Sequence, residues 1–173
     1  MKISIIGSGN VATVLAKLIS NSEHEIIHVF SRTLENAAEL ANQYNAGYSD
    51  YNGTPKSQTD LYIIATADQS FEQLLPNFRV NNHFIVHTAG SISKDILHNV
   101  SENYGVLYPL QTLHKSTTNL PEIPLLIDAN TEGNINILTF AFLIKQKLKT
   151  IPPLWFYIIL KHRFSVAFYF NHN

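Results

Sequence analysis

The chain of 173 residues carries 12 basic and 13 acidic side chains, and 45% of its residues are hydrophobic. This length and composition are typical of one globular domain, with room for a fragment of a second. The balanced charge leaves no basic excess to neutralise a phosphate backbone, so we expect no nucleic-acid partner. Because the chain has no cysteine, disulfides, thiolate metal sites and a cysteine nucleophile are excluded, and no metal site is predicted.

The apolar run at the N-terminus is too short for a targeting segment. A secretory signal needs about 7–15 uninterrupted apolar residues before its cleavage site. Here Gly7, Ser8, Gly9 and Asn10 follow directly after Ile6. No stretch of the chain reaches the roughly 18 apolar residues that cross a bilayer. We therefore expect a cytoplasmic protein without a membrane partner.

Strand and helix patterns alternate along the chain. Short β-branched or apolar runs indicate strands, and apolar residues three and four apart indicate amphipathic helices. The predicted strands are 2–6, 25–30, 61–67, 83–87, 105–108 and 125–127. The first predicted helix starts after Asn10, and the others cover 34–44, 68–75 and Ser93 or Asp95 to about Val100. Residues 47–59 are turn-like. This alternation predicts an α/β fold with a doubly wound, mainly parallel, Rossmann-like sheet over roughly residues 1–130.

The first predicted strand ends in Gly7-Ser8-Gly9-Asn10-Val11-Ala12, the pattern G-x-G-x-x-A. In such a turn the first glycine allows the bend, the second lets a pyrophosphate approach the backbone, and the small third residue packs close to the strand. Asn10 can cap the following helix, whose free N–H groups would face an anion. Glycines at a strand–helix bend also have purely structural reasons, but the position after a strand and before a helix favours dinucleotide binding.

The second predicted strand indicates which dinucleotide this is. A site that selects NAD usually places an acid about 20 residues after the glycines, whereas this strand ends in VFSRT without one. Arg32 can bind a 2′-phosphate and stack on adenine, and the hydroxyls of Ser31 and Thr33 can donate to phosphate oxygens. The alternative to phosphate binding is that Arg32 is a solvated loop residue and Thr33 is a simple helix cap. The position favours NADP over NAD.

Two further strands end in small and polar residues that would face the same crevice. One ends in Thr66-Ala67-Asp68 and the other in His87-Thr88-Ala89-Gly90-Ser91. His87 is either a proton donor or substrate contact, or a structural histidine, since no carboxylate can be placed beside it from sequence. Ser91 is equally well the cap of the next helix. No catalytic residue is assigned.

Taken together, GSGNVA, SRT, HTAGS and YPLQT (residues 108–112) resemble a bacterial family of Rossmann-like proteins regarded as NADP oxidoreductases. Members of that family carry a helical C-terminal domain known as domain of unknown function 2520. The N-terminal half is also similar, more distantly, to deazaflavin-dependent NADP oxidoreductases, pyrroline-5-carboxylate reductases and 6-phosphogluconate dehydrogenase-like enzymes. The resemblance covers roughly residues 1–130 and implies a reaction class without a particular substrate.

The resemblance also implies a cofactor site and a loop near substrate. Tyr108, Pro109 and Gln111 lie where related dehydrogenases bring such a loop, and a structural turn explains them equally well. The implied cofactor residues are Gly7, Ser8, Gly9, Asn10 and Val11 at the pyrophosphate, Ser31, Arg32 and Thr33 at the adenosine phosphate, and Thr66, Ala67, Asp68, His87, Thr88, Ala89 and Gly90 on the nicotinamide side.

Residues 131–173 depart from the family pattern, in which a longer run of helices closes the cleft and forms a dimer. Leu154–Leu160 and Phe164–Phe170 are dense in aromatic residues, and no acidic residue follows Glu132. A helix there would be apolar on nearly all sides and would have to be buried. We interpret 131–173 either as a truncated or frame-shifted start of the helical domain, or as a short form that buries this segment in a homodimer.

These features predict an NADP-binding oxidoreductase, or its cofactor-binding portion, that moves hydride between nicotinamide and a small carbonyl or imine substrate. A non-catalytic NADP-binding or sensing protein is the alternative, because no acid–base pair can be placed. A third possibility is an inert domain whose glycine turn only packs. We expect a homodimer formed through the C-terminal region.

Overall fold

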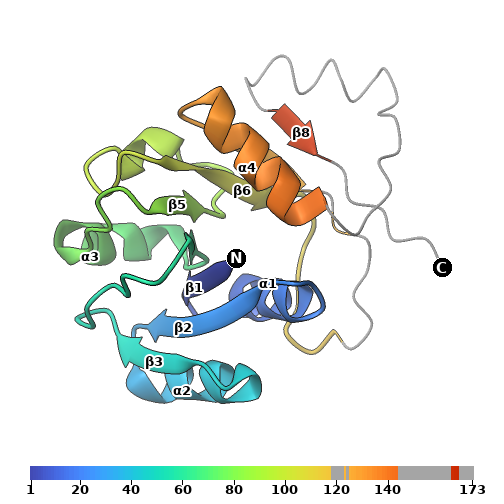
Figure 1. Cartoon of the computed structure of the whole chain (residues 1–173). Helices are drawn as coiled ribbons and strands as arrows, with labels where there is room; N and C mark the ends of the chain where they lie inside the picture. Colours follow the sequence, from blue (N-terminus) through green and yellow to red (C-terminus); the bar gives the residue numbers. More distant parts are fainter. Residues whose placement is uncertain (118–122, 124, 144–164, 168–173) are drawn as a thin grey trace.

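The computed structural model describes residues 1–117, 123, 125–143 and 165–167, which form an eight-stranded sheet in the order β3-β2-β1-β4-β5-β6-β7-β8 (Figure 1). Neighbouring strands from β3 to β6 pair in parallel, whereas β7 and β8 are antiparallel to their neighbours. The strands are β1 Lys2–Ile6, β2 Glu25–Ser31, β3 Gly47–Asp50, β4 Leu61–Ile64, β5 Phe84–His87, β6 Tyr104–Pro109, β7 Leu125–Ala129 and β8 Ser165–Ala167. The predicted mainly parallel, doubly wound α/β fold is confirmed.

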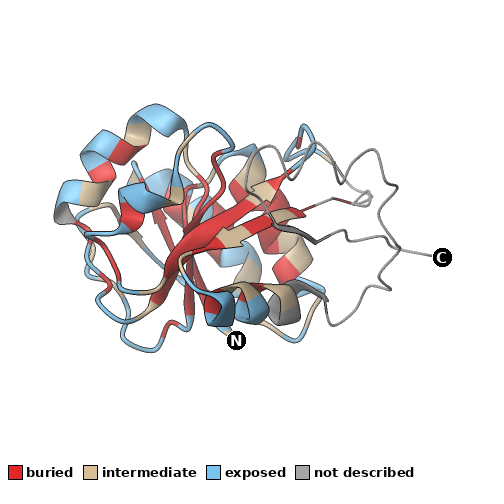
Figure 2. Ribbon diagram, turned by 90° about the horizontal axis from the view of Figure 1, so that it is seen from above, coloured by how far each residue is buried: buried red, intermediate tan, exposed pale blue. Residues whose placement is uncertain are grey.

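Helices cover both faces of this sheet. The α-helices are α1 Asn10–Ser20, α2 Leu34–Ala41, α3 Phe71–Leu74 and α4 Glu132–Leu143, and the short 3-10 helices are η1 Asn42–Tyr44, η2 Asp68–Ser70, η3 Leu75–Asn77 and η4 Lys94–Leu97. One apolar cluster joins the sheet to α1, α2 and α4, and a second joins it to α3 and η4. Burial from both sides explains why the central strands read as unbroken apolar runs (Figure 2).

The strand order reverses between β1 and β4. The chain winds from β1 outward to β2 and β3, then returns to place β4 on the other side of β1. In open α/β sheets, ligands bind outside the carboxyl ends of the strands at such a switch point. The glycine turn follows β1 directly, so it lies at this position.

Residues 47–50 form strand β3, so the predicted turn over 47–59 is wrong at its start. β3 pairs in parallel with β2, with Gly47 opposite His28 and Asp50 opposite Ser31. None of the four β3 residues is buried, so this edge strand lacks the apolar pattern by which strands are recognised. Smaller differences concern element ends: the helix predicted over 34–44 finishes as η1, and the helix predicted over 68–75 is the series η2, α3 and η3.

The described part of residues 131–173 packs on the same sheet. Helix α4 contacts β6 and β7, and its Leu138 is fully buried in the cluster beneath α1. Strand β8 continues the sheet beyond β7, with Ala167 opposite Leu125. Most of the two aromatic segments lies outside the described residues, and the domain division at residue 130 stays a prediction. In the described part of the chain, no helix combines the length and hydrophobicity needed to cross a membrane.

Candidate dinucleotide-binding site

Gly7, the first glycine of the turn, is required by the fold itself. Its φ of +123° is a backbone conformation that L-residues rarely adopt. A Cβ on Gly7 would overlap the carbonyl oxygen of Ala65 at the end of β4. The Gly7 N–H donates to the Phe30 carbonyl at 2.7 Å, which ties the turn to β2. Gly7 therefore locks the chain between the two neighbouring strands.

Gly9, the second glycine, faces open space instead. Its φ of −80° suits any residue, and a Cβ there would meet no atom within 4 Å. Gly9 is the residue that precedes the first turn of α1, and no side chain caps that turn. The first N–H groups of a helix have no partner inside the helix, and they carry the positive end of its dipole. An exposed backbone of this kind can accept a phosphate without displacing any side chain.

The predicted capping role of Asn10 is wrong. Asn10 is the first residue of α1 and Gly9 stands in the cap position. The Asn10 Oδ1 accepts a hydrogen bond of 3.1 Å from the backbone N–H of Lys115, a residue of the segment that follows β6. The Asn10 side chain is therefore engaged in holding another part of the chain.

The end of β2 lies beside the glycine turn, as predicted. Ser8 and Ser31 share a hydrogen bond of 2.7 Å between their hydroxyl oxygens, and Ser31 is buried. Arg32 is exposed and makes no hydrogen bond or ion pair among the described residues. Thr33 precedes α2 in extended conformation without a side-chain capping bond. A free guanidinium and a pair of hydroxyls thus stand next to the open backbone of Gly9.

Arg32 is also close enough to act electrostatically on Tyr51, which follows β3. Burial raises the pKa of the Tyr51 phenol, and the positive charge of Arg32 opposes that rise. The ring of Tyr51 packs against the second apolar cluster. The carboxyl ends of β2 and β3 therefore bring one cation near a partly buried aromatic residue.

Residues at the ends of β4 and β5 come together, as the sequence predicts. The Ser91 hydroxyl donates to the Asp68 carboxylate at 2.7 Å, which joins the two strand ends. Thr66 lies against Gly7, and its buried Oγ1 has no hydrogen-bond partner in the described part of the chain. A buried hydroxyl without a partner costs about 1–3 kcal/mol, so this atom favours a polar ligand beside the turn.

His87 is fully buried and both of its ring nitrogens are engaged. The Ala89 N–H donates to Nδ1 at 3.2 Å, and Nε2 lies 3.3 Å from the Ser93 carbonyl, to which it can only donate. Burial lowers the pKa of His87, while these hydrogen bonds and the charge of Asp68 partly offset that effect. The imidazole is therefore held neutral as a structural group, and it makes a T-shaped ring contact with Phe71.

The remaining predicted residues line the same edge to different degrees. Ala67 and Gly90 are exposed, Val11 is partly exposed, and Thr88 and Ala89 are buried. The ring of Tyr108 lies over Gly90, where a Cβ would stand 2.7 Å from its Cζ. Of the predicted substrate loop, the structure thus brings Tyr108 to the strand ends. Pro109 is buried, and Gln111 is exposed.

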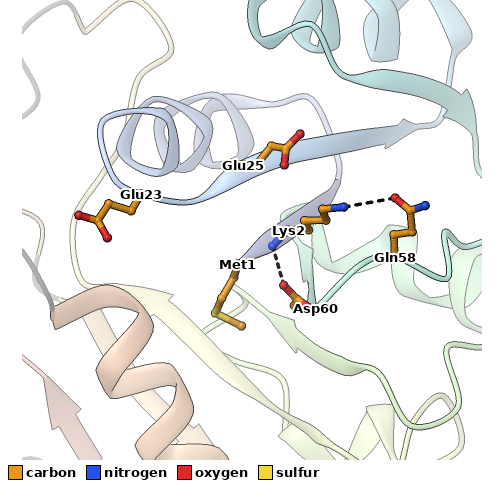
Figure 3. Close-up of a pocket in the computed structure, with 6 residues that line it drawn as sticks. All are labelled: Met1, Lys2, Glu23, Glu25, Gln58 and Asp60. Atoms are coloured by element: carbon orange, nitrogen blue, oxygen red, sulfur yellow. Dashed lines mark hydrogen bonds between the residues drawn. The ribbon is translucent and has the colours of Figure 1, made fainter.

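A pocket of about 510 Å³ lies at the opposite edge of the sheet, where the strands begin (Figure 3). The Lys2 N–H donates to the Asp60 carboxylate at 2.7 Å and the Lys2 ammonium donates to Gln58 at 3.4 Å. Glu23 and Glu25 supply two more carboxylates. Three carboxylates would repel the phosphates of a dinucleotide, so this pocket does not fit the cofactor. Among the described residues, no three acidic or histidine side chains gather closely enough to hold a metal ion.

The geometry at the carboxyl edge agrees with a comparison of sequences. Residues 2–90 match the family described as NADP oxidoreductase coenzyme F420-dependent. The chain belongs to this family. The matched segment runs from β1 to Gly90 and so includes the glycine turn, the end of β2 and the ends of β4 and β5. Members of this family are nicotinamide-dinucleotide-binding oxidoreductases.

Known structures show the same fold. The chain is similar to a candidate NADP oxidoreductase from Bacteroides fragilis, with 34% identity and a TM-score of 0.74 over 82% of this chain and 55% of that one. It is also similar in fold to 1-pyrroline-5-carboxylate reductase from Streptococcus pyogenes, with 20% identity and a TM-score of 0.64 over 92% and 67% of the two chains.

Among curated proteins, the chain is similar to glutamyl-tRNA reductase from Wigglesworthia glossinidia brevipalpis. The two are 25% identical over 181 aligned positions, which cover 96% of this chain and 40% of that protein. The chain therefore spans less than half of this relative and about half of the Bacteroides structure.

Proposed function

We propose that this chain is an NADP-dependent oxidoreductase, or the cofactor-binding portion of one, acting on a small carbonyl or imine substrate. The observation that carries the proposal is the open backbone of Gly9 at the start of α1, together with Arg32 after β2, which has no hydrogen bond or ion pair in the described part of the chain. A bound nicotinamide would supply the hydride chemistry. The residues of the chain would bind and orient the cofactor.

The carboxyl edge offers suitable groups for each part of the cofactor. The N–H groups that follow Gly9 would hold the pyrophosphate. Arg32 would bind the 2′-phosphate, since a guanidinium pairs with phosphate in two parallel hydrogen bonds and a ribose hydroxyl offers it no charge. The unpartnered Thr66 hydroxyl, the Asp68–Ser91 pair and Tyr108 would border the nicotinamide side.

Several further properties belong to the same proposal. We infer a cytoplasmic homodimer formed through the C-terminal region, without nucleic-acid or membrane partners. The likeness of GSGNVA, SRT, HTAGS and YPLQT to the bacterial family with a helical C-terminal domain supports an arrangement in which such a domain would complete the cleft. The names of the relatives, which include reductases of a cyclic imine and of an aminoacyl-tRNA, support reduction of a carbonyl or imine group.

A non-catalytic NADP-binding protein is the second candidate. The state of His87 favours it, because a buried neutral imidazole with both nitrogens engaged is poorly placed to transfer a proton. Binding without turnover, measured with a panel of small carbonyl and imine compounds, would support this candidate over the enzyme.

Calorimetric titration of the wild-type chain with NADPH and with NADH tests the proposal. We expect NADPH to bind about tenfold or more tightly than NADH, because a charge-assisted phosphate contact contributes about 1.5–3 kcal/mol. The variant Arg32→Ala should lose most of this preference while its affinity for NADH stays unchanged. Lys2→Ala, which removes one positive charge at the opposite edge, is the matched control. Equal affinity of the wild type for both cofactors would refute the assignment of NADP.

A further inference from the structure

The segment that follows β6, residues 110–117, crosses from the end of β6 to helix α1 (Figure 1). We call it the β6–α1 strap. Its Leu113 is buried in the core cluster beneath α1. Both backbone groups of Lys115 are hydrogen-bonded to α1. Its N–H donates to the Asn10 Oδ1 at 3.1 Å, and its carbonyl accepts from the Lys17 ammonium at 2.9 Å. The same ammonium donates to the Thr117 carbonyl at 2.9 Å.

These contacts fix the backbone of Lys115 next to the first residue of α1. Asn10 follows Gly9 directly, so the strap is attached one residue after the open backbone of Gly9. Both hydrogen bonds use backbone groups of Lys115 and leave its side chain available. Lys115 is exposed, and its ammonium has no hydrogen bond or ion pair in the described ranges. The segment from Leu110 to Thr117 contains no acidic residue.

The backbone of this lysine is held at the first residue of α1, so its flexible side chain can extend toward an anion bound before the helix. The N-terminus of a helix carries about half a positive charge, and a cation near it is destabilising. Lys17 lies in the last turn of α1, where a cation is favourable, and its ammonium donates to two carbonyl oxygens of the strap. In the described ranges the ammonium of Lys115 has no such partner. A phosphate bound before α1 would attract both the helix N-terminus and the Lys115 ammonium.

We propose that Lys115 is a cofactor-binding residue whose ammonium pairs with the pyrophosphate of the dinucleotide, and that Asn10 is the positioning residue that holds it there. This inference rests on the proposed dinucleotide function. Asn10 then acts on the cofactor through the strap rather than by contacting the pyrophosphate itself. Lys115 binds the pyrophosphate, which NADPH and NADH share. Arg32 binds the 2′-phosphate, which only NADPH carries.

Titrations of Lys115→Ala with NADPH and with NADH test this proposal. We expect both affinities to fall by a similar factor of about five to ten, and the salt dependence of binding to become weaker, because one screened charge pair is lost. Lys115 is exposed, so the melting temperature should stay that of the wild type. Lys2→Ala at the opposite edge is the charge-matched control and should bind both cofactors normally.

The role of Asn10 has a readout that needs no cofactor. In Asn10→Ala, the amide hydrogen of Lys115 loses its acceptor, so its exchange with solvent should accelerate, and the affinity for both cofactors should fall. Unchanged affinities in Lys115→Ala would overturn the proposal. A loss confined to NADPH would also overturn it, since Lys115 would then serve the 2′-phosphate. If the wild type binds neither cofactor, the proposed function itself fails, and this inference fails with it.

Discussion

The two edges of the sheet differ in charge and in the state of their polar groups. At the amino edge, a pocket of about 510 Å³ is lined by Glu23, Glu25 and Asp60, and the nearby Lys2 is bonded to two of its neighbours. At the carboxyl edge, the chain presents open backbone at Gly9, and Arg32 has no hydrogen bond or ion pair among the described residues. The amino-edge pocket is thus the worse site for a phosphate-bearing ligand.

The difference makes the carboxyl edge the better candidate for a phosphate-bearing ligand. In the described part of the chain, this edge holds helix N–H groups without a side-chain cap, a buried hydroxyl without a partner, and Arg32 without a counter-ion. Each of them would gain a partner from a dinucleotide. The polar groups of the amino-edge pocket already satisfy one another in part, and three of its six lining residues are carboxylates.

Gly7→Ala should have the largest effect on stability, because it disrupts the turn that holds β1, β2 and β4 together at the carboxyl edge. The new Cβ would overlap the Ala65 carbonyl, and the φ of +123° would be strained. We expect a loss of about 3 kcal/mol or more in the free energy of unfolding, measured by urea denaturation. Gly9→Ala, at a helix cap with an ordinary φ, is the matched control and should cost no more than about 1 kcal/mol. Equal stability of the two variants would mean that the turn is not built as described.

Lowering the pH should reduce the stability of the fold, by less than Gly7→Ala does. This effect comes from buried histidines, which belong to the fold and not to the proposed cofactor site. Burial, helped by the charge of Lys56, lowers the pKa of His28 from its ordinary 6.5 to about 4. Below pH 6.5 the unfolded chain binds a proton that folded His28 does not, so stability is full above pH 6.5 and falls as the pH approaches 4. The pKa of buried His87 is lowered as well, and this acts in the same direction. We expect the melting temperature to drop by a few degrees from pH 7 to pH 5.

The variant His87→Gln separates the two roles of that residue. The variant should melt at a lower temperature than the wild type, and its melting temperature should depend less on acid. Its NADPH affinity at pH 7 should stay within about threefold of the wild-type value, a change of less than about 1 kcal/mol. A normal melting temperature combined with a large loss of affinity would instead make His87 part of the site.

Neutralising the amino-edge pocket should have the smallest effect. Glu25→Gln removes an exposed carboxylate far along the strands from the glycine turn. We expect the free energy of unfolding to change by less than ~0.5 kcal/mol and the NADPH affinity to stay the same. A marked gain in NADPH affinity would indicate that the cofactor lies near the amino edge after all.

The parallel sheet could be predicted because its central strands are apolar on both faces and are followed by turns with glycine or capping residues. Strand β3 could not, since it lies at an edge and none of its residues is buried. The site residues at the ends of β1, β2, β4 and β5 were predictable from the fold rule that places them at one edge.

Other features of the site depend on contacts that local sequence does not contain. Asn10 and Lys115 are 105 residues apart, so no spacing pattern connects them. The G-x-G pattern also does not say which glycine serves the fold and which is open to a ligand. The neighbours of Gly7 and the empty space at Gly9 make that distinction.

A calorimetric titration of Gly9→Val with NADPH, beside the wild type, tests whether the cofactor binds at the start of α1. The site requires an open backbone at Gly9, and a valine side chain would occupy the space where the pyrophosphate must lie. Gly9 has an ordinary φ, and a Cβ there would meet no atom within 4 Å, so the variant should fold with a loss of about 1 kcal/mol for valine at a helix cap. We predict that NADPH binding falls at least a hundredfold, about 2.7 kcal/mol. A folded Gly9→Val variant that binds NADPH as tightly as the wild type would contradict the account.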